Sequence, residues 1–362
     1  MESSLFALFH IIRMKEETKV LYLHIRYHVK RLVLIIGMIV LLGANGHAQG
    51  AGADHLYAIL VNGGRNRLTN HERYWNDCAF LYRTLRQTYH VPKRHITVLM
   101  SDGGAAYEDM LQADGRGFRS SPVDLDGDGQ ADVDYPATSQ TLVNVLFNMS
   151  LRLKADDHLF LYIIDHGGSE DDSEESFIWL WDDEKMNDYS LAALLSMLRV
   201  GTINILMGQC HSGGFVADLA REGCIIATAC SGSEQSWACP DRPYDEFVYH
   251  WTCAVNGADE TGKPVDADDN GDGEVSMLEA FRYAQAHDRL RETPQYASWP
   301  EQLGEQWTVT HTLSGTLGIQ EIETADENPA EMWTLSGQRR TQADGHAIYI
   351  QRKGGKTRKI IR

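Results

Sequence analysis

Five short apolar runs, rich in Ile, Leu and Val, alternate with amphipathic segments through most of the chain. Strands are expected over residues 55–64, 95–103, 158–168, 203–210 and 224–231. Helices are expected over 73–89, 139–153 and 190–199, where apolar side chains recur every three or four residues. Nearly continuous apolar strands separated by helices are typical of a parallel sheet covered on both faces. The sequence therefore predicts an α/β three-layer sandwich with a mostly parallel sheet.

The N-terminal segment is expected to be removed before the protein folds. Lys30 and Arg31 precede an apolar run of 13 residues, Leu32–Ala44, and small residues follow as far as Ala48. This is the layout of a secretory signal peptide, and the run is shorter than the ~20 residues of a membrane-spanning helix. Residues 1–48 are therefore interpreted as a signal peptide cleaved near Ala48, with an uncleaved signal anchor as the alternative. The mature protein is expected to be secreted or at the cell surface, with no stable membrane span.

The mature chain is strongly acidic. The whole sequence has a formal net charge of −18, and residues 1–48 carry six basic and three acidic side chains, so the remainder carries −21. A protein with this charge does not attract nucleic acid through its overall field. The charge excludes nucleic acid as an expected partner and favours cations.

Six cysteines follow the signal segment. Four of them fall within residues 224–253, and an exported protein can form disulfides, so one or two bridges are expected there, with the connectivity left open. The six are Cys78, Cys210, Cys224, Cys230, Cys239 and Cys253.

Two of the apolar runs end in the same unusual way. FLYIIDHGG ends in a histidine and two glycines at His166–Gly168, and NILMGQCHSGG ends in Cys210, a second histidine and two glycines. Ligand sites in such sheets gather beyond the carboxyl ends of the strands, so the two tips can face each other if the strands are neighbours. An imidazole that takes the proton of a thiol creates a nucleophilic thiolate. The pair predicts a cysteine nucleophile, Cys210, with His166 as its base.

The glycines suit the same chemistry. A glycine lets a backbone N–H approach an oxyanion closely, so the N–H groups of Gly167 and Cys210 are candidate oxyanion donors. His211 is a rival base, but its side chain is expected to point away from that of Cys210. The plainer alternative is that both strand ends are structural and the cysteine is simply buried.

The two motifs resemble the His and Cys motifs of legumain-type cysteine peptidases, which are relatives of caspases and gingipains. NGGRNRLTNHERYWNDC and IATACSGSEQSWACPD resemble the first loop and the segment after the cysteine in the same family. The resemblance covers roughly residues 55–310. It implies a caspase-like sandwich over 49–317 that cleaves peptide bonds of a peptide or protein substrate through a thioacyl-enzyme, with no cofactor for catalysis.

The resemblance also implies roles for single residues. His166 matches the general base, Cys210 the nucleophile, Gly167 the oxyanion glycine, and Asn70 an asparagine that orients the histidine. Ser236, His250 and Arg73 are the expected substrate-binding residues.

The expected substrate pocket departs from the legumain pattern. Gly208 replaces a glutamate of legumains, His250 falls near an aspartate of the pocket, and the pocket arginine is either replaced by Glu72 or shifted to Arg73. Cleavage after asparagine is therefore not predicted. A transamidase that uses the same acyl-enzyme, and a non-catalytic calcium-binding surface protein, are the alternatives to an endopeptidase.

Two acidic loops have calcium-type ligand spacing. The loop 268–279 carries a complete EF-hand pattern, and 124–135 fits the first nine positions but has Tyr135 at the twelfth. Both are expected to hold structural Ca²⁺. The predicted ligands are Asp268, Asn270, Asp272, the carbonyl of Glu274 and Glu279 in one loop, with Ser276 at the ninth position, and Asp124, Asp126, Asp128, Gln130 and Asp132 in the other.

The chain changes character near residue 318. A polar linker is followed by short strand-like segments, and eight basic residues fall between Arg339 and Arg362. Residues 318–362 are interpreted as a linker and a small β tail. The tail resembles the C-terminal sorting domains of the type IX secretion pathway, with an edge hairpin packed on the catalytic domain as the alternative.

Overall fold

The computed structural model describes residues 52–170 and 175–310, and four strands of the C-terminal tail. The chain divides into two compact units, Met1–Leu313 and Ser314–Arg362, and each is described by itself. The expected signal peptide, residues 1–48, lies outside the described residues. Within the described part of the chain, no helix is both long enough and apolar enough to cross a membrane.

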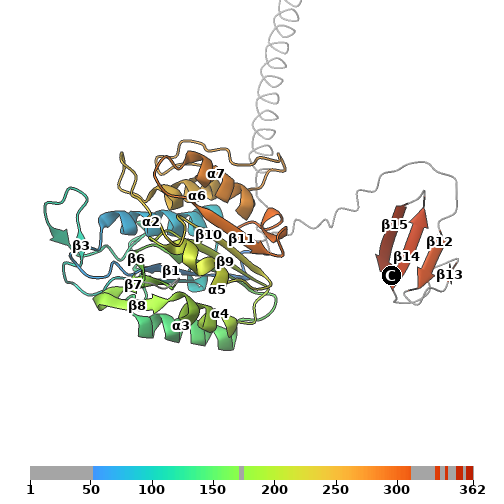
Figure 1. Cartoon of the computed structure of the whole chain (residues 1–362), viewed down its shortest axis with the longest axis horizontal. Coiled ribbons are helices and arrows are strands. Elements are labelled where there is room, and N and C mark those ends of the chain that lie inside the picture. Colours follow the sequence, from blue (N-terminus) through green and yellow to red (C-terminus); the bar gives the residue numbers. More distant parts are fainter. Residues whose placement is uncertain are drawn as a thin grey trace, which may run out of the picture. The chain divides into compact units, whose positions relative to one another are not determined.

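A six-stranded sheet forms the centre of the first unit (Figure 1). Five strands are parallel, and the last strand in sequence pairs antiparallel with its neighbour at one edge. Each strand expected from the sequence is present. In spatial order they are β11 (Gln295–Trp299), β10 (Cys224–Thr228), β9 (Thr202–Met207), β5 (His158–Ile163), β1 (Leu56–Asn62) and β2 (Ile96–Met100).

Helices cover both faces of this sheet (Figure 1). On one face lie α2 (Glu72–Arg83), α6 (Glu246–Asn256) and α7 (Met277–His287), and on the other lie α3 (Ser139–Arg152), α4 (Asp188–Ser196) and the short α5 (Phe215–Asp218). Successive strand residues alternate between the two cores, so Leu60 packs with the first group and Ile59 with the second. The predicted α/β sandwich is confirmed.

The three predicted helices are present with shifted ends. A π-helical turn, Thr84–Thr88, extends α2 so that the helical segment ends close to the expected residue 89. The sequence pattern did not predict α6. Nine of its eleven residues are buried, so the helix has no polar face whose 3.6-residue repeat would be visible in the sequence.

A small antiparallel sheet follows His166 directly and was not expected. It consists of β6 (Gly167–Ser169), β7 (Ser176–Leu180) and β8 (Glu184–Asn187). A two-stranded ribbon, β3 (Met110–Leu111) with β4 (Phe118–Arg119), lies between β2 and α3. These strands are too short to show a clear alternation of apolar and polar residues.

The order of the strands places a switch point next to β1. From β1 the chain first adds β2 on one side and then β5, β9 and β10 on the other. Connections therefore diverge at the carboxyl ends of β1 and β5, which is where open α/β sheets form their ligand crevices.

The expected disulfides are absent, because the cysteines that are close in sequence lie in different places. All six fall within the described residues, and all are free thiols. Cys224 is the first residue of β10 and packs in the core, Cys230 contacts Ser212, and Cys239 lies with Cys253 in a separate aromatic cluster without bonding to it. The prediction of one or two bridges within 224–253 is therefore wrong for this structure.

The tail forms a four-stranded antiparallel sheet of its own. Its strands are β12 (Glu331–Thr334), β13 (Arg339–Arg340), β14 (Ile348–Lys353) and β15 (Lys356–Ile361), in the order β13-β12-β14-β15. The expected short strands are present, and a sorting role remains a prediction.

Candidate active site

The sheet register brings the two sequence motifs together. Strands β5 and β9 are parallel neighbours, and Ile163 stands opposite Met207. His166 and Cys210 each follow three residues beyond that pair, so they leave the sheet at the same level. Gly167 touches the cysteine directly, because a Cβ added to it would lie 2.0 Å from the carbonyl oxygen of Cys210. The predicted meeting of the two strand ends is present in the structure.

The loop after β1 holds the imidazole of His166. Its Nε2 atom lies 3.0 Å from the carbonyl oxygen of Thr69. A carbonyl can only accept, so Nε2 carries the hydrogen and a neutral ring keeps the lone pair of Nδ1 available. Burial lowers the pKa of His166, and the nearby charge of Arg73 lowers it further, while the Thr69 carbonyl raises it. The ring is therefore set up to be a neutral base at neutral pH.

Two aromatic neighbours pack against this ring. His71 and Tyr74 both meet His166 edge to face, with ring centroids 5.6 and 5.4 Å away. The hydroxyl of Tyr74 accepts a hydrogen bond from Arg73 and lies 3.4 Å from each ring nitrogen of His166. Burial, followed by the charge of Arg73, lowers the pKa of His71 to about 4, so His71 is neutral beside the base.

The side chain of Asn70, which was expected to orient His166, bonds Ser101 and Asp109. Its side-chain amide donates to the hydroxyl of Ser101 at 2.7 Å and to the carbonyl of Asp109 at 2.9 Å. Asn70 is fully buried and anchors the loop whose preceding residue, Thr69, contacts the imidazole. The backbone carbonyl of Thr69 thus does what was expected of the Asn70 side chain.

Cys210 differs from the other thiols in its exposure. Among the six cysteines it alone is partly exposed. Its Sγ lies 3.8 Å from both the carbonyl oxygen and the hydroxyl of Ser236, so this expected substrate-binding residue borders the sulfur. Burial raises the pKa of Cys224 to about 12 and that of Cys230 to about 11, which keeps both thiols protonated and inert.

Gly167 has the position of an oxyanion donor. Trp179 donates its N–H to the carbonyl of His166. Because hydrogen-bonded and non-hydrogen-bonded pairs alternate in an antiparallel ladder, the next pair, Gly167 with Ile178, is non-hydrogen-bonded. The N–H of Gly167 therefore points away from β7 and is not used by the ladder.

His211 is turned away from the catalytic pair, as expected. Its backbone is left-handed, with φ of 58°, and its Nδ1 lies 2.9 Å from the carbonyl oxygen of Gly232. The imidazole is thereby tied to the following loop. His166 remains the candidate base.

Arg73 is already paired beside the cleft. Its Nε lies 3.1 Å from both carboxylate oxygens of the buried Asp245, and its Nη2 reaches Tyr74. Glu72 points the other way, toward Arg119 and the N–H of Ala113. Both residues line the hollow described next, and Arg73 is the one that also bonds Tyr74 beside His166.

A hollow of about 450 Å³ lies next to these residues. Its lining includes His71, Arg73, Ala238 and Arg242, so it borders both the loop after β1 and the loop after β10. Arg242 is itself paired with Asp241. The cations of this hollow are thus largely neutralised, which does not favour a strongly acidic side chain of a substrate.

His250 is not part of this hollow, and its expected substrate-binding role is corrected. It lies on α6 with Nε2 3.6 Å from Glu246, and its ring faces His287 and Tyr283 of α7. It lines a separate hollow of about 610 Å³. The aspartate that faces Arg73 is Asp245, just before α6.

Asp165 directly precedes His166 in FLYIIDHGG, and it was not among the residues expected to act at the site. Its Oδ1 accepts the N–H of His166 at 2.5 Å, and a Cβ added to Gly63 would lie 2.1 Å from its Oδ2. The buried carboxyl thus joins the end of β5 to the glycine turn after β1. Burial raises its pKa well above the usual range.

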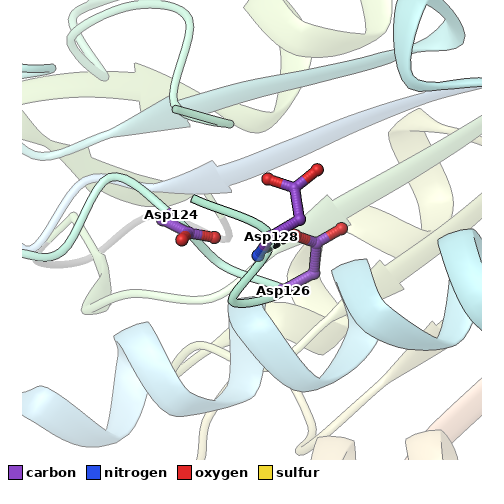
Figure 2. A group of neighbouring side chains, drawn as sticks. All are labelled: Asp124, Asp126 and Asp128. Atoms are coloured by element: carbon purple, nitrogen blue, oxygen red, sulfur yellow. Dashed lines mark hydrogen bonds between the residues drawn. The ribbon is translucent and has the colours of Figure 1, made fainter. Parts of the chain in front are cut away.

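The first acidic loop gathers three carboxylates. One oxygen each of Asp124, Asp126 and Asp128 lie within 4.8 Å of one another, and Figure 2 shows the three side chains on a single turn of the loop. Gln130 follows them and bonds Asp128. Asp132 does not join this group: it is buried and bonds Tyr82 at 2.7 Å and Lys93 at 2.6 Å, so its predicted role as a ligand is corrected.

The second acidic loop has the turn of an EF-hand. The carboxylate of Asp268 accepts the N–H groups of Gly271 and Gly273, at 2.7 and 2.8 Å. Asn270 accepts from Asp272, and Asp272 accepts from Glu274. The buried carboxylate of Glu279, at the start of α7, reaches back to the N–H groups of Asn270 and Ser276.

Comparison with known proteins agrees with this site. The sequence model of the Peptidase C13 family matches residues 56–261, which include His166, Cys210, Ser236 and Asp245. The chain belongs to the peptidase C13 family. Membership in this legumain family implies cysteine peptidase or transamidase activity, with proteins or peptides as substrates. The second acidic loop, α7 and β11 lie beyond the matched residues.

Further comparisons are less informative. No protein of curated function matches the chain. A crystal structure of a protein from Geobacter sulfurreducens aligns with 67% of this C13 chain and 92% of its own length, at 13% identity and a TM-score of 0.39.

Proposed function

We propose that this C13 protein is an endopeptidase in which Cys210 is the nucleophile and His166 the general base. The observation that carries the proposal is the hydrogen bond from His166 Nε2 to the Thr69 carbonyl, beside a partly exposed cysteine on the neighbouring strand. This contact fixes the tautomer in which Nδ1 can accept a proton.

The reaction follows from these groups. Nδ1 of His166 takes the thiol proton, and Sγ of Cys210 forms a bond to the carbonyl carbon of the scissile peptide. The N–H groups of Gly167 and Cys210 donate to the oxyanion. The imidazolium then returns its proton to the leaving amine as the C–N bond breaks, and water hydrolyses the thioester with His166 again as base.

Substitution of the nucleophile tests this proposal. Cys210→Ala is expected to abolish cleavage of a mixed peptide library without changing the circular dichroism spectrum. Cys253→Ala, which alters a buried thiol of α6, is the matched control and should retain activity. Full activity of Cys210→Ala would exclude the proposal. A wild-type Cys210 that does not react with iodoacetamide at neutral pH would favour the non-catalytic alternative.

The same acyl-enzyme can be intercepted by an amine, which would make the protein a transamidase. Product analysis with added hydroxylamine or a glycine peptide distinguishes the two outcomes. Hydrolysis products in excess at millimolar amine support the endopeptidase, and predominant amine adducts support the transamidase.

We also propose that residues 1–48 direct export, so that the enzyme acts outside the cytoplasm. The charge layout of Lys30–Ala48 supports this. N-terminal sequencing of protein recovered outside the cytoplasm should begin near Gln49. Recovery of the uncleaved chain in the cytoplasm alone would contradict export.

We propose that the two acidic loops bind structural Ca²⁺. In the first loop the support is the convergence of Asp124, Asp126 and Asp128. In the second it is the EF-hand order of Asp268, Asn270, Asp272 and Glu279, all oxygen donors suited to Ca²⁺.

A further inference from the structure

A short segment beyond the family match packs against the loop that borders Cys210. We call Asp288–Thr293 the brace and Ser231–Cys239 the cleft loop. Glu292 of the brace accepts the N–H of Trp237 at 3.0 Å through Oε2. Thr293 donates to the carboxylate of Glu234 through its N–H, at 3.1 Å, and through its hydroxyl, at 3.0 Å. The brace is therefore bonded to the cleft loop at two points.

The Glu292 contact acts on the peptide group next to the nucleophile. The peptide that joins Ser236 to Trp237 is planar, so its C=O and N–H point in opposite directions. Its N–H is held by Glu292, and its C=O lies 3.8 Å from Sγ of Cys210. Because Glu292 holds the N–H of this planar group, it also fixes the direction in which the Ser236 carbonyl points toward Sγ of Cys210.

The cleft loop is also joined to the catalytic turn at its other end. The carbonyl of Glu234 accepts the N–H of His211 at 2.8 Å. The side chain of Glu234 accepts the N–H of Ser231 at 3.1 Å, which closes the loop on itself. A shift of the brace would therefore move the backbone on both sides of Cys210.

Glu292 is held by a second carboxyl. Its Oε1 atom and Oδ2 of Asp288 are buried and take no partner among ordinary donors of the described residues. The charge of Asp288 acts on Glu292, so the two carboxyls are neighbours. Two carboxylates cannot bond without a proton, and a proton shared between them would satisfy both of these buried oxygens. Burial, with the charge of Asp288 as the next cause, raises the pKa of Glu292 to about 10.

The surroundings of the pair favour the retained proton. The titratable groups that face it from the packed elements are Asp245, just before α6, Glu246, at the start of α6, and the buried thiol of Cys230, just before the cleft loop. Two of these three neighbours, Asp245 and Glu246, carry carboxyls, so a second negative charge on the pair would meet their repulsion.

We propose that Glu292 is a positioning residue of the active site: by accepting the N–H of Trp237 it holds the Ser236–Trp237 peptide and fixes the cleft loop beside Cys210. This role rests on the proposed peptidase function, but the brace itself can be tested without substrate. It lies outside residues 56–261, so it is an addition to the part that matches the family.

The pair makes the cleft loop sensitive to alkaline pH. The pKa of Glu292 is raised by folding, so its contribution to stability is complete below the unfolded value of about 4.3 and is lost as pH rises toward about 10. At the end of that range Glu292 loses its proton in the folded protein. Glu292 and Asp288 then both carry a negative charge, and their repulsion weakens the hold of the brace on Trp237.

Three variants test the role of Glu292. Glu292→Gln keeps an oxygen for the Trp237 N–H and supplies an N–H for Asp288, so it needs no proton. Glu292→Ala removes both contacts. Glu301→Gln, at an exposed carboxylate before the final 3-10 turn, is the matched control.

Hydrogen exchange of residues 231–239 is measured for each full-length variant between pH 6 and 10, together with kcat/KM on the best library peptide. Glu292→Ala should exchange faster than the control at every pH and lose about tenfold or more in kcat/KM. Glu292→Gln should match the control near neutral pH. At alkaline pH its cleft loop should keep its protection relative to the intrinsic exchange rate, whereas the control should lose protection. Equal exchange in Glu292→Ala and the control would overturn the proposal.

The two proposals fail in different ways. If wild type cleaves no peptide but Glu292→Ala still releases the cleft loop, the brace stands and the peptidase function falls. If wild type cleaves and Glu292→Ala keeps both the exchange rate and kcat/KM, the peptidase stands and the positioning role falls. A Glu292→Gln variant that loses the alkaline protection of the loop would show that no proton is shared.

Discussion

Nε2 of His166 donates to the carbonyl oxygen of Thr69 at 3.0 Å, which couples the tip of β5 to the loop after β1. The two segments are 97 residues apart in sequence and meet at the switch point of the sheet. The contact decides which imidazole nitrogen can act as a base. It also makes the orientation of the base depend on a backbone atom, which no substitution of the Thr69 side chain removes.

Activity should fall on the acid side below the ordinary pKa of histidine. Burial and Arg73 lower the pKa of His166, so the ring stays neutral to a pH below 6.5. A histidine whose folded pKa is depressed also contributes stability above the unfolded value, which is lost as pH falls toward the folded value. The pH profile of kcat/KM checks this expectation. An acid-side midpoint at or above 6.5 would contradict it.

Asn70→Ala should destabilise the protein and reduce activity together. The substitution leaves the buried Ser101 hydroxyl and the Asp109 carbonyl without their donor, which costs about 2 kcal/mol in the free energy of unfolding. Urea denaturation and kcat measure the two effects. A loss of kcat with unchanged stability would indicate that Asn70 acts on His166 directly.

Gly167→Ala should lower activity about a hundredfold or more. The added Cβ would lie 2.0 Å from the carbonyl oxygen of Cys210 and would push the nucleophile away. Gly104→Ala is the matched control, since no atom lies within 4 Å of a Cβ added there. Kinetics and circular dichroism are measured for both. Activity in Gly167→Ala equal to that of Gly104→Ala would exclude the close contact.

Arg73 and Asp245 should behave as a coupled pair. Removing either side chain leaves a partly buried charge alone, so Arg73→Ala and Asp245→Ala are each expected to cost about 3–5 kcal/mol. The double variant should cost clearly less than the sum. A double-mutant cycle by urea denaturation measures the coupling, and additive effects would mean that the ion pair is not formed in solution.

Chelation of calcium should lower the melting temperature. Ca²⁺ that binds the folded state stabilises it by about 2.7 kcal/mol at a concentration a hundred times Kd. The shift caused by EGTA should shrink in Asp268→Ala and in Asp124→Ala, and remain in Glu301→Gln. Calorimetry that shows the same melting temperature with Ca²⁺ and with EGTA would contradict binding at both loops.

The central sheet and the meeting of the His166 and Cys210 strand ends were predictable because they depend on local pattern. The runs around Phe160 and Leu206 are apolar on both faces, which marks buried parallel strands, and the glycines after His166 and Cys210 mark where each strand ends. Neighbouring strands then place the two tips together. The same pattern predicted the helices α2, α3 and α4.

The partners of the site could not be read from the sequence. The contacts of His166 with Thr69, and of Arg73 with Asp245, join segments about 100 to 170 residues apart through a backbone carbonyl or a buried carboxylate. No spacing rule connects such groups. His250 was expected to bind substrate, and only the fold shows that Asp245, just before α6, is the residue that faces Arg73.

The register of β5 and β9 sets the positions of His166 and Cys210 independently of the loops that border the cleft. The spacing of His166 and Cys210 is set by hydrogen bonds between two central strands, whereas the neighbouring hollow is lined by residues from the segments 71–73, 111–115 and 238–243. Exchanging those loops between relatives would therefore alter which peptides are accepted while the reacting atoms keep their places. The scaffold is in that respect a suitable starting point for engineered proteases with new cleavage preferences.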